Sequence, residues 1–141
     1  MYVDQNNVLS DAQAVTATAS STKSIDTTTA LRNIGSGEPV EVVILVTTTC
    51  LATAGASNVT FSLDDSADNS TFAVIAQSPA IAKGTLLAGY EAFRIRIPAT
   101  SRRYVQVTYT VDTNNLTAGA FTSFLALNRQ DNVARTAGFT V

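Results

Sequence analysis

Alternation of apolar and polar residues with a period of two is the feature that most restricts how this chain can fold. Across residues 104–111 the odd positions are Val, Val, Tyr and Val, and the even positions are Tyr, Gln, Thr and Thr. Such alternation is typical of an antiparallel strand with one buried face and one solvated face. Helical periodicity is nearly absent elsewhere in the chain, so we expect an all-β protein.

The same alternation predicts a strand over residues 92–97, with its aromatic and isoleucine side chains inward and Arg94 and Arg96 outward. Pro98 ends this strand, because proline cannot donate a hydrogen bond to a neighbouring strand. Further strands are predicted over 57–64, 71–77 and 120–128, and a weakly patterned β-prone stretch covers 14–25.

Residues 40–48 differ because both faces of the predicted strand are apolar. The even positions from 40 to 46 are Val, Val, Ile and Val, while Val43 and Leu45 lie on the opposite face. A strand of this kind is central in a sandwich, covered by a terminal arm, or placed at a subunit interface.

Seven or eight short strands indicate a single-domain antiparallel jelly-roll sandwich that spans residues 1–141. Residues 1–13 and 129–141 are polar with scattered apolar anchors, and we expect them to form extended N- and C-terminal arms. A Thr-Ala-Gly turn recurs at 53–55 and 117–119, where glycine would supply a positive φ before a strand.

The absence of histidine and the presence of a single cysteine remove most catalytic chemistry. No Ser-His or Cys-His nucleophile pair, no His-containing zinc site and no intrachain disulfide can be formed. We therefore expect a structural or binding protein with no catalytic residues, no cofactor and no metal. The net charge of −2 argues against nucleic-acid binding, and neither a signal peptide nor a membrane span is expected.

Asp64, Asp65 and Asp68 form the only acidic cluster. A calcium loop needs regularly spaced oxygen ligands and a glycine at a sharp turn. This cluster has no such glycine and no closing glutamate, so a polar hairpin loop is the favoured interpretation. Cys50 is expected to pack as a small hydrophobe at a strand end, because no cationic residue lies near it in the sequence.

Four arginines flank one connection between strands: Arg94, Arg96, Arg102 and Arg103. They could form a contact patch for an acidic protein surface, since arginine is the cation favoured at interfaces. They could equally be a solvated edge paired with carboxylates such as Glu91 and Asp112, which would contribute little free energy. The sequence leaves both interpretations open.

A carbohydrate-binding or adhesin-like sandwich is the alternative function. Such proteins use exposed aromatic platforms, and this chain has no Trp and only Tyr2, Tyr90 and Tyr104 as weak candidates. A paired-carboxylate enzyme is the least supported class, because the glutamates near strand ends lack an apolar pocket pattern around them.

Several stretches, which together cover almost the whole chain, carry a resemblance to a known family. They are Met1–Asp4, the Ala-Thr-Ser segment that ends at Ser24–Asp26, Ile34–Pro39, Arg103–Val105, Leu116–Gly119, Asn128–Gln130 and Gly138–Val141. In their order and in both termini the chain resembles the jelly-roll capsid cement (decoration) proteins of tailed double-stranded DNA bacteriophages.

This resemblance implies a protein that binds the outside of a capsid shell, bridges major capsid proteins and stabilises the shell. It implies homodimers or homotrimers, assembly in the host cytoplasm and a final place on the outer capsid surface of the virion. The expected partners are the major capsid protein and the chain itself, with no nucleic acid and no membrane. The predicted contact residues are Tyr2, Val3, Leu9, Arg94, Arg96, Arg102, Arg103, Arg129, Arg135, Phe139 and Val141.

Overall fold

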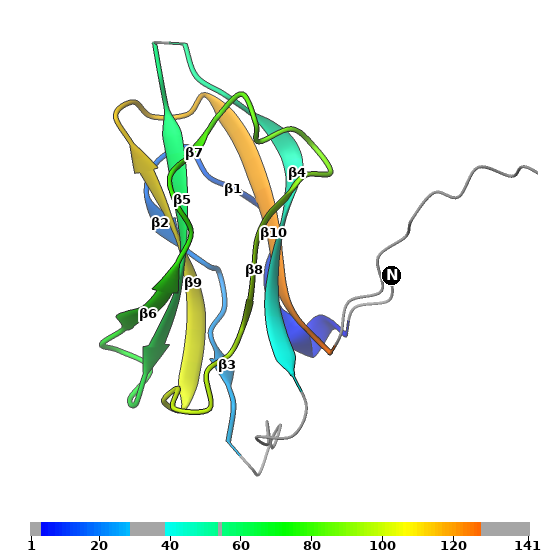
Figure 1. Cartoon of the computed structure of the whole chain (residues 1–141), viewed down its shortest axis with the longest axis vertical. Coiled ribbons are helices and arrows are strands. Elements are labelled where there is room, and N and C mark those ends of the chain that lie inside the picture. The colour runs from blue at the N-terminus through cyan, green and yellow to red at the C-terminus, as the bar shows by residue number, and fades with distance from the viewer. Residues whose placement is uncertain (1–3, 29–38, 54, 128–141) are drawn as a thin grey trace, which may run out of the picture.

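Strands make up most of the computed structural model, which describes residues 4–28, 39–53 and 55–127 (Figure 1). The elements in this part of the chain are η1 (Gln5–Asn7, a 3₁₀ helix), β1 (Val8–Ala14), β2 (Ala19–Ser20), β3 (Ile25–Asp26), β4 (Val40–Leu51), β5 (Asn58–Ser66), β6 (Ala73–Gln77), β7 (Ile81–Ala82), β8 (Glu91–Arg96), β9 (Tyr104–Asp112) and β10 (Ala118–Leu127). None of these elements is a helix long and apolar enough to cross a membrane.

Two antiparallel sheets face each other in a sandwich (Figure 1). Sheet A has the order β1-β10-β4-β8, and sheet B has the order β2-β9-β5-β6, with β3 also paired to β9 and β7 to β5. β2 and β3 both pair with β9, and β6 and β7 both pair with β5, so each of these two pairs of short strands counts as one strand of the fold. The eight strands that result, numbered in chain order, are arranged 1-8-3-6 in sheet A and 2-7-4-5 in sheet B. This is the jelly-roll arrangement. The expected fold class is therefore confirmed.

The strand positions follow the alternation seen in the sequence, but several ends differ. β5 continues to Ser66, so Asp64 and Asp65 belong to a strand and not to a hairpin loop. β4 reaches Leu51, and β10 begins at Ala118. In these places pairing with a neighbouring strand, which local alternation does not reveal, extends the element.

The N-terminal arm was predicted too long. The predicted arm covered residues 1–13, but Val8–Ala14 form β1, an edge strand of sheet A paired with β10. Two register shifts interrupt this pairing, and Ala12 has a φ of 44°. These irregularities weaken the alternation, which is why the sequence concealed the strand.

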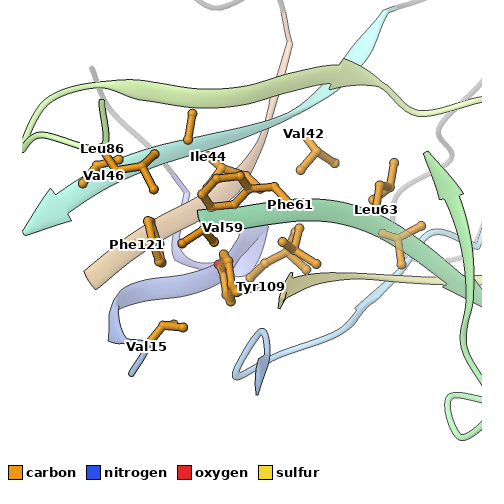
Figure 2. Packing of buried hydrophobic residues seen from close by; sticks show 14 of the residues in the cluster. Val15, Val42, Ile44, Val46, Val59, Phe61, Leu63, Leu86, Tyr109 and Phe121 are labelled. Atoms are coloured by element: carbon orange, nitrogen blue, oxygen red, sulfur yellow. The ribbon is translucent and has the colours of Figure 1, made fainter. Parts of the chain in front are cut away.

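One hydrophobic core fills the space between the two sheets. Figure 2 shows Val42, Ile44 and Val46 of β4 directed toward Phe61 of β5 and Tyr109 of β9. The rings of Tyr109 and Phe121 stack with centroids 5.1 Å apart, and the Phe61 ring meets both of them edge-on. Offset and edge-to-face pairs of this kind contribute beyond the apolar area that they bury.

A polar contact links the two sheets through this core. The Tyr109 hydroxyl of β9 lies 2.9 Å from the Ser10 Oγ of β1 and 2.9 Å from the Ser123 Oγ of β10. All three residues have an exposed fraction of 0%. Buried hydroxyls must be hydrogen-bonded because an unsatisfied one keeps its full desolvation cost. The link therefore favours one relative placement of the sheets.

Tyr109→Phe should lower the free energy of unfolding by about 1–3 kcal/mol, because it leaves the Ser123 hydroxyl in the core without this partner. Urea unfolding would measure the change. Tyr90→Phe, at a half-exposed tyrosine, is the matched control and should have little effect. A Tyr109→Phe variant as stable as the wild type would show that the link contributes nothing.

The glycines of the repeated Thr-Ala-Gly turn do not behave alike. Gly55 precedes β5 with a φ of 48°, as expected, but Gly119 lies inside β10 with a φ of 159°. There a Cβ would come within 3.0 Å of the Cys50 Sγ. Gly119 is therefore required for close approach of two strands and not for a turn.

Candidate contact surfaces

The outer face of sheet A, opposite the core, carries a second apolar cluster. Val8 of β1, Val43 of β4 and Phe124 of β10 are buried there, with Leu45 and Ala126 packed against them. η1 contacts β10 and lies on this side of the sheet (Figure 1). β4 is central, between β10 and β8. This explains its two apolar faces, one in the sandwich core and one in the outer cluster.

Exposed large apolar side chains are more numerous in and beside sheet A than in sheet B. Of the large hydrophobic residues that are exposed in the described part, four belong to sheet A or to the connection that enters β8, and one, Val74, belongs to β6 in sheet B. The four are Leu51, Leu87, Tyr90 and Leu127. Leu51 follows the core residue Cys50 in β4, so its side chain points to the outer face.

The connection before β8 runs alongside the end of β4 and brings Leu87 close to Leu51. The Cys50 amide donates to the Leu86 carbonyl over 3.0 Å, and the Ala88 amide donates to the Thr49 Oγ1 over 3.1 Å. Leu51 and Leu87 are 56% and 54% exposed. Sequence reasoning missed both residues, since neither lies in the alternating part of a predicted strand.

The charged residues of sheet A lie along its β8 edge. The register places Arg94 opposite Val43 and Arg96 opposite Glu41, so their side chains share the outer face. The Arg94 Nε donates to the Glu41 Oε2 over 2.7 Å. The sequence suggested Glu91 as a partner for the arginines, and Glu91 lies opposite Leu45 at the same edge.

Arg102 and Arg103 lie elsewhere, immediately before β9 of sheet B. Arg102 holds Asp65, which is 3% exposed: its Nη2 and Nε donate to the Asp65 Oδ1 over 2.6 and 2.8 Å, and its amide donates to Oδ2 over 2.7 Å. Arg103 pairs with Asp26 of β3 over 2.7 Å and covers the Tyr104 ring at 4.8 Å. The four arginines therefore do not form one patch. Arg94, Arg102 and Arg103 pair with Glu41, Asp65 and Asp26, respectively.

The carboxylates of the acidic cluster, Asp64, Asp65 and Asp68, are also held by protein groups. Asp64 accepts from Ser62 over 2.8 Å and from Thr108 over 2.5 Å. The Asp68 Oδ1 accepts from the amides of Ser70 and Thr71, each over 3.0 Å. Within the described ranges no group of three or more Cys, Asp and Glu side chains is placed to hold a metal ion.

These contacts shift the pKa values of several carboxyl groups downward. Hydrogen bonds from Arg103 lower the pKa of Asp26 to about 2, and backbone hydrogen bonds, first from Thr71, lower that of Asp68 to about 2. Burial alone would raise the pKa of Asp65, but the hydrogen bonds and charge of Arg102 outweigh it and the net shift is downward. Burial raises the pKa of Cys50 to about 11, as expected of a packing residue and not of a nucleophile.

A depressed carboxyl pKa predicts how stability depends on pH. The stabilisation is complete above the unfolded-state pKa near 4 and is lost as pH falls through the folded-state pKa. Stability should therefore decrease between about pH 4 and pH 2. It should be constant from about pH 5 to 8, because the chain has no histidine. Urea midpoints across this range test the prediction, and a marked change between pH 6 and 8 would contradict it.

The structure places the predicted contact residues in different environments. Leu9 is fully buried in the sandwich core, so its prediction as a contact residue is wrong: β1 is a strand of the sandwich and turns Leu9 inward. Arg94, Arg96, Arg102 and Arg103 lie on the surface in two separate places. The remaining predicted residues lie outside the described part of the chain: Tyr2, Val3, Arg129, Arg135, Phe139 and Val141.

Nothing in the described part favours a carbohydrate platform. Tyr104 has one ring face occupied by the Arg103 guanidinium, and Tyr90 is 40% exposed in a connection. A glycan platform needs accessible ring faces that lie together. Tyr104 belongs to β9 of sheet B, whereas Tyr90 lies in the connection that enters β8 of sheet A.

The family model of Bbp16 matches residues 9–125, a span that runs from β1 to β10. The chain belongs to the Bbp16 family. This family is phage-related, and membership indicates a structural protein of a bacteriophage virion. A search of curated proteins finds no match to the chain.

Proposed function

We propose that this Bbp16-family protein binds the outer surface of a bacteriophage capsid shell and stabilises the shell by bridging major capsid proteins. The observation that carries the proposal is the family match across the sandwich, together with a jelly-roll order that agrees with the cement proteins that the sequence resembles. The role requires a rigid body with several contact surfaces and no catalysis. On a symmetric shell, many weak identical contacts add through effective concentration, so that no single contact must be strong.

The distribution of surface chemistry supports such a role. Leu51 and Leu87 are exposed in and beside sheet A, and the charges along β8 include a paired Glu41 and Arg94. The outer face of sheet B carries pairs of polar residues, such as Thr60 opposite Thr110. Exposed leucines at one sheet and polar pairs on the other suit a protein that is covered on one side and solvated on the other.

Binding to shells tests the proposal directly. Purified protein is titrated against isolated capsid shells that lack it, and the bound fraction is measured by co-sedimentation. We expect saturation at a fixed ratio to the major capsid protein and a higher temperature of shell disruption. Absence of saturable binding would overturn the proposed function, and binding to a glycan array by the free protein would favour the adhesin-like alternative.

Deletion of residues 129–141 should weaken shell binding about tenfold or more while the sandwich remains folded. β10 ends at Leu127, so the deletion leaves intact every strand and core residue in the described part of the chain. Loss of one set of contacts on a repeating lattice reduces the total affinity steeply. The measurement is the same titration, with urea unfolding as the control for folding. A truncated protein that binds as tightly as the intact chain would contradict the predicted role of the C-terminal arm.

A further inference from the structure

We propose that Asn69 is a deamidation site whose reactivity the fold suppresses, and that the Asp68 carboxylate is the group that suppresses it. Asn69 lies in the exposed loop between β5 and β6 and has a φ of 60°. The inference goes beyond the proposed function, because it concerns the chemical durability of the folded chain and not what the chain binds.

Deamidation is an attack by the backbone nitrogen of the following residue on the asparagine side chain. At this site the Ser70 nitrogen would form a bond to the Asn69 Cγ, and the bond from Cγ to Nδ2 would break. The proton of the Ser70 amide would leave with the side-chain nitrogen as ammonia. Water would then open the succinimide ring to aspartate or isoaspartate, and isoaspartate lengthens the backbone of the loop.

The sequence singles out Asn69 among the asparagines for this reaction. Asn69 is the only asparagine of the chain that precedes a residue with a small side chain, Ser70, whereas the others precede Val, Ile, Leu, Arg or a second Asn. A bulky following side chain hinders closure of the ring. Asparagine suits the position because it adopts a positive φ more readily than most residues. The conformation of the loop therefore favours a chemically reactive pair of residues at an exposed place.

The attacking nitrogen is already engaged in the folded chain. The Ser70 amide donates to the Asp68 Oδ1 over 3.0 Å. The same oxygen accepts from the Thr71 amide over 3.0 Å and from the Ser66 hydroxyl over 2.8 Å, so the carboxylate is held in place. A hydrogen bond to an ionised acceptor is stronger than one between neutral groups. Attack on Asn69 requires the Ser70 amide to give up this bond and its proton.

The charge of Asp68 acts in the same direction. Hydrogen bonds from Thr71, Ser66 and Ser70 lower the pKa of Asp68 to about 2. The carboxylate is therefore ionised at the neutral and mildly alkaline pH at which deamidation proceeds. A negative charge beside an N–H group disfavours loss of its proton, because a second negative charge would form next to the first.

The group under attack is held as well. The Ser24 Oγ, in the connection between β2 and β3, donates to the Asn69 Oδ1 over 2.6 Å, across 45 residues of sequence. This contact restricts rotation of the Asn69 side chain. Both reacting groups are thus fixed by hydrogen bonds that exist only in the folded chain, and unfolding releases them together.

Conversion of Asn69 in the purified full chain, followed by peptide mapping and mass spectrometry at mildly alkaline pH, tests the inference. We expect the folded wild type to convert at least about tenfold more slowly than the same chain in guanidinium chloride, since a charge-assisted hydrogen bond must first break. Asp68→Ala should bring the folded chain close to the denatured rate. Ser66→Ala is the matched control, because it removes a hydroxyl from the same loop but keeps the carboxylate beside the Ser70 amide, and it should convert like the wild type.

Hydrogen exchange of the Ser70 amide shows whether its contact is lost in each variant, and circular dichroism shows whether the variant is folded. A folded wild type that converts as fast as the denatured chain would overturn the inference, and this comparison needs no variant. Asp68→Ala at the wild-type rate would also overturn it. Ser66→Ala as fast as Asp68→Ala would assign the effect to general loosening of the loop and refute the role of Asp68. Shell binding plays no part in these measurements, so the proposed function is tested separately.

Discussion

Phe61→Ala is expected to lower the free energy of unfolding by about 3–5 kcal/mol, the range for loss of a buried phenylalanine. Phe61 has no exposed surface and meets the rings of Tyr109 and Phe121 edge-on, with the Phe121 centroid 5.1 Å away. The substitution opens a cavity where β5, β9 and β10 meet, and close packing prevents the neighbouring side chains from filling it. A loss of this size is a large part of the stability of an ordinary domain.

Urea unfolding at neutral pH measures the effect, provided that the variant folds. Phe61→Leu is a second variant that keeps most of the apolar volume and should lose clearly less. Phe93→Ala, at a half-buried position in β8, is the matched control for loss of an aromatic ring outside the three-ring cluster. If Phe61→Ala were less destabilising than Phe93→Ala, the ring cluster would not be the centre of the core.

Arg102→Met is the second large effect, with an expected loss of about 2–3 kcal/mol. It leaves the buried Asp65 carboxylate with only the Arg102 amide in place of the charged partner. Removing one member of a buried ion pair is costly because the remaining charge is uncompensated. The Arg102 side chain is 41% exposed, which places the expected loss below the usual range for a fully buried pair.

Arg103→Met is the matched control, because the neighbouring arginine also forms an ion pair but is 50% exposed. A pair exposed to that extent contributes about 1 kcal/mol or less. Adding Asp65→Asn to Arg102→Met should restore part of the stability by removing the unpaired charge. The stability difference between Arg102→Met and the wild type should also shrink as pH falls, since burial without Arg102 raises the pKa of Asp65. Equal losses for Arg102→Met and Arg103→Met would contradict the argument.

The outer apolar cluster of sheet A was only partly predictable from the sequence. Val43 and Leu45 were recognisable as a second apolar face of the strand, and that pattern is compatible with a central strand, a strand covered by an arm or a strand at a subunit interface. Nothing local indicated that Phe124 and Val8 lie beside Val43, because β1, β4 and β10 are far apart in the chain and meet only through sheet pairing. The partners of the arginines could not be predicted for the same reason. Arg102 and Asp65 are separated by 37 residues in the sequence, and Arg103 and Asp26 by 77.

From the sequence alone one could establish that this chain is an antiparallel β protein, where most strands lie, and which side chains of β8 and β9 face inward. Alternation carries this information because side chains on a strand point to opposite faces with a period of two. Only the tertiary structure decided that Val8–Ala14 is a strand, that Asp64 and Asp65 are buried, and that the arginines are divided between two sheets. These outcomes depend on contacts between residues distant in the chain, and the free energy of such contacts is absent from any local pattern.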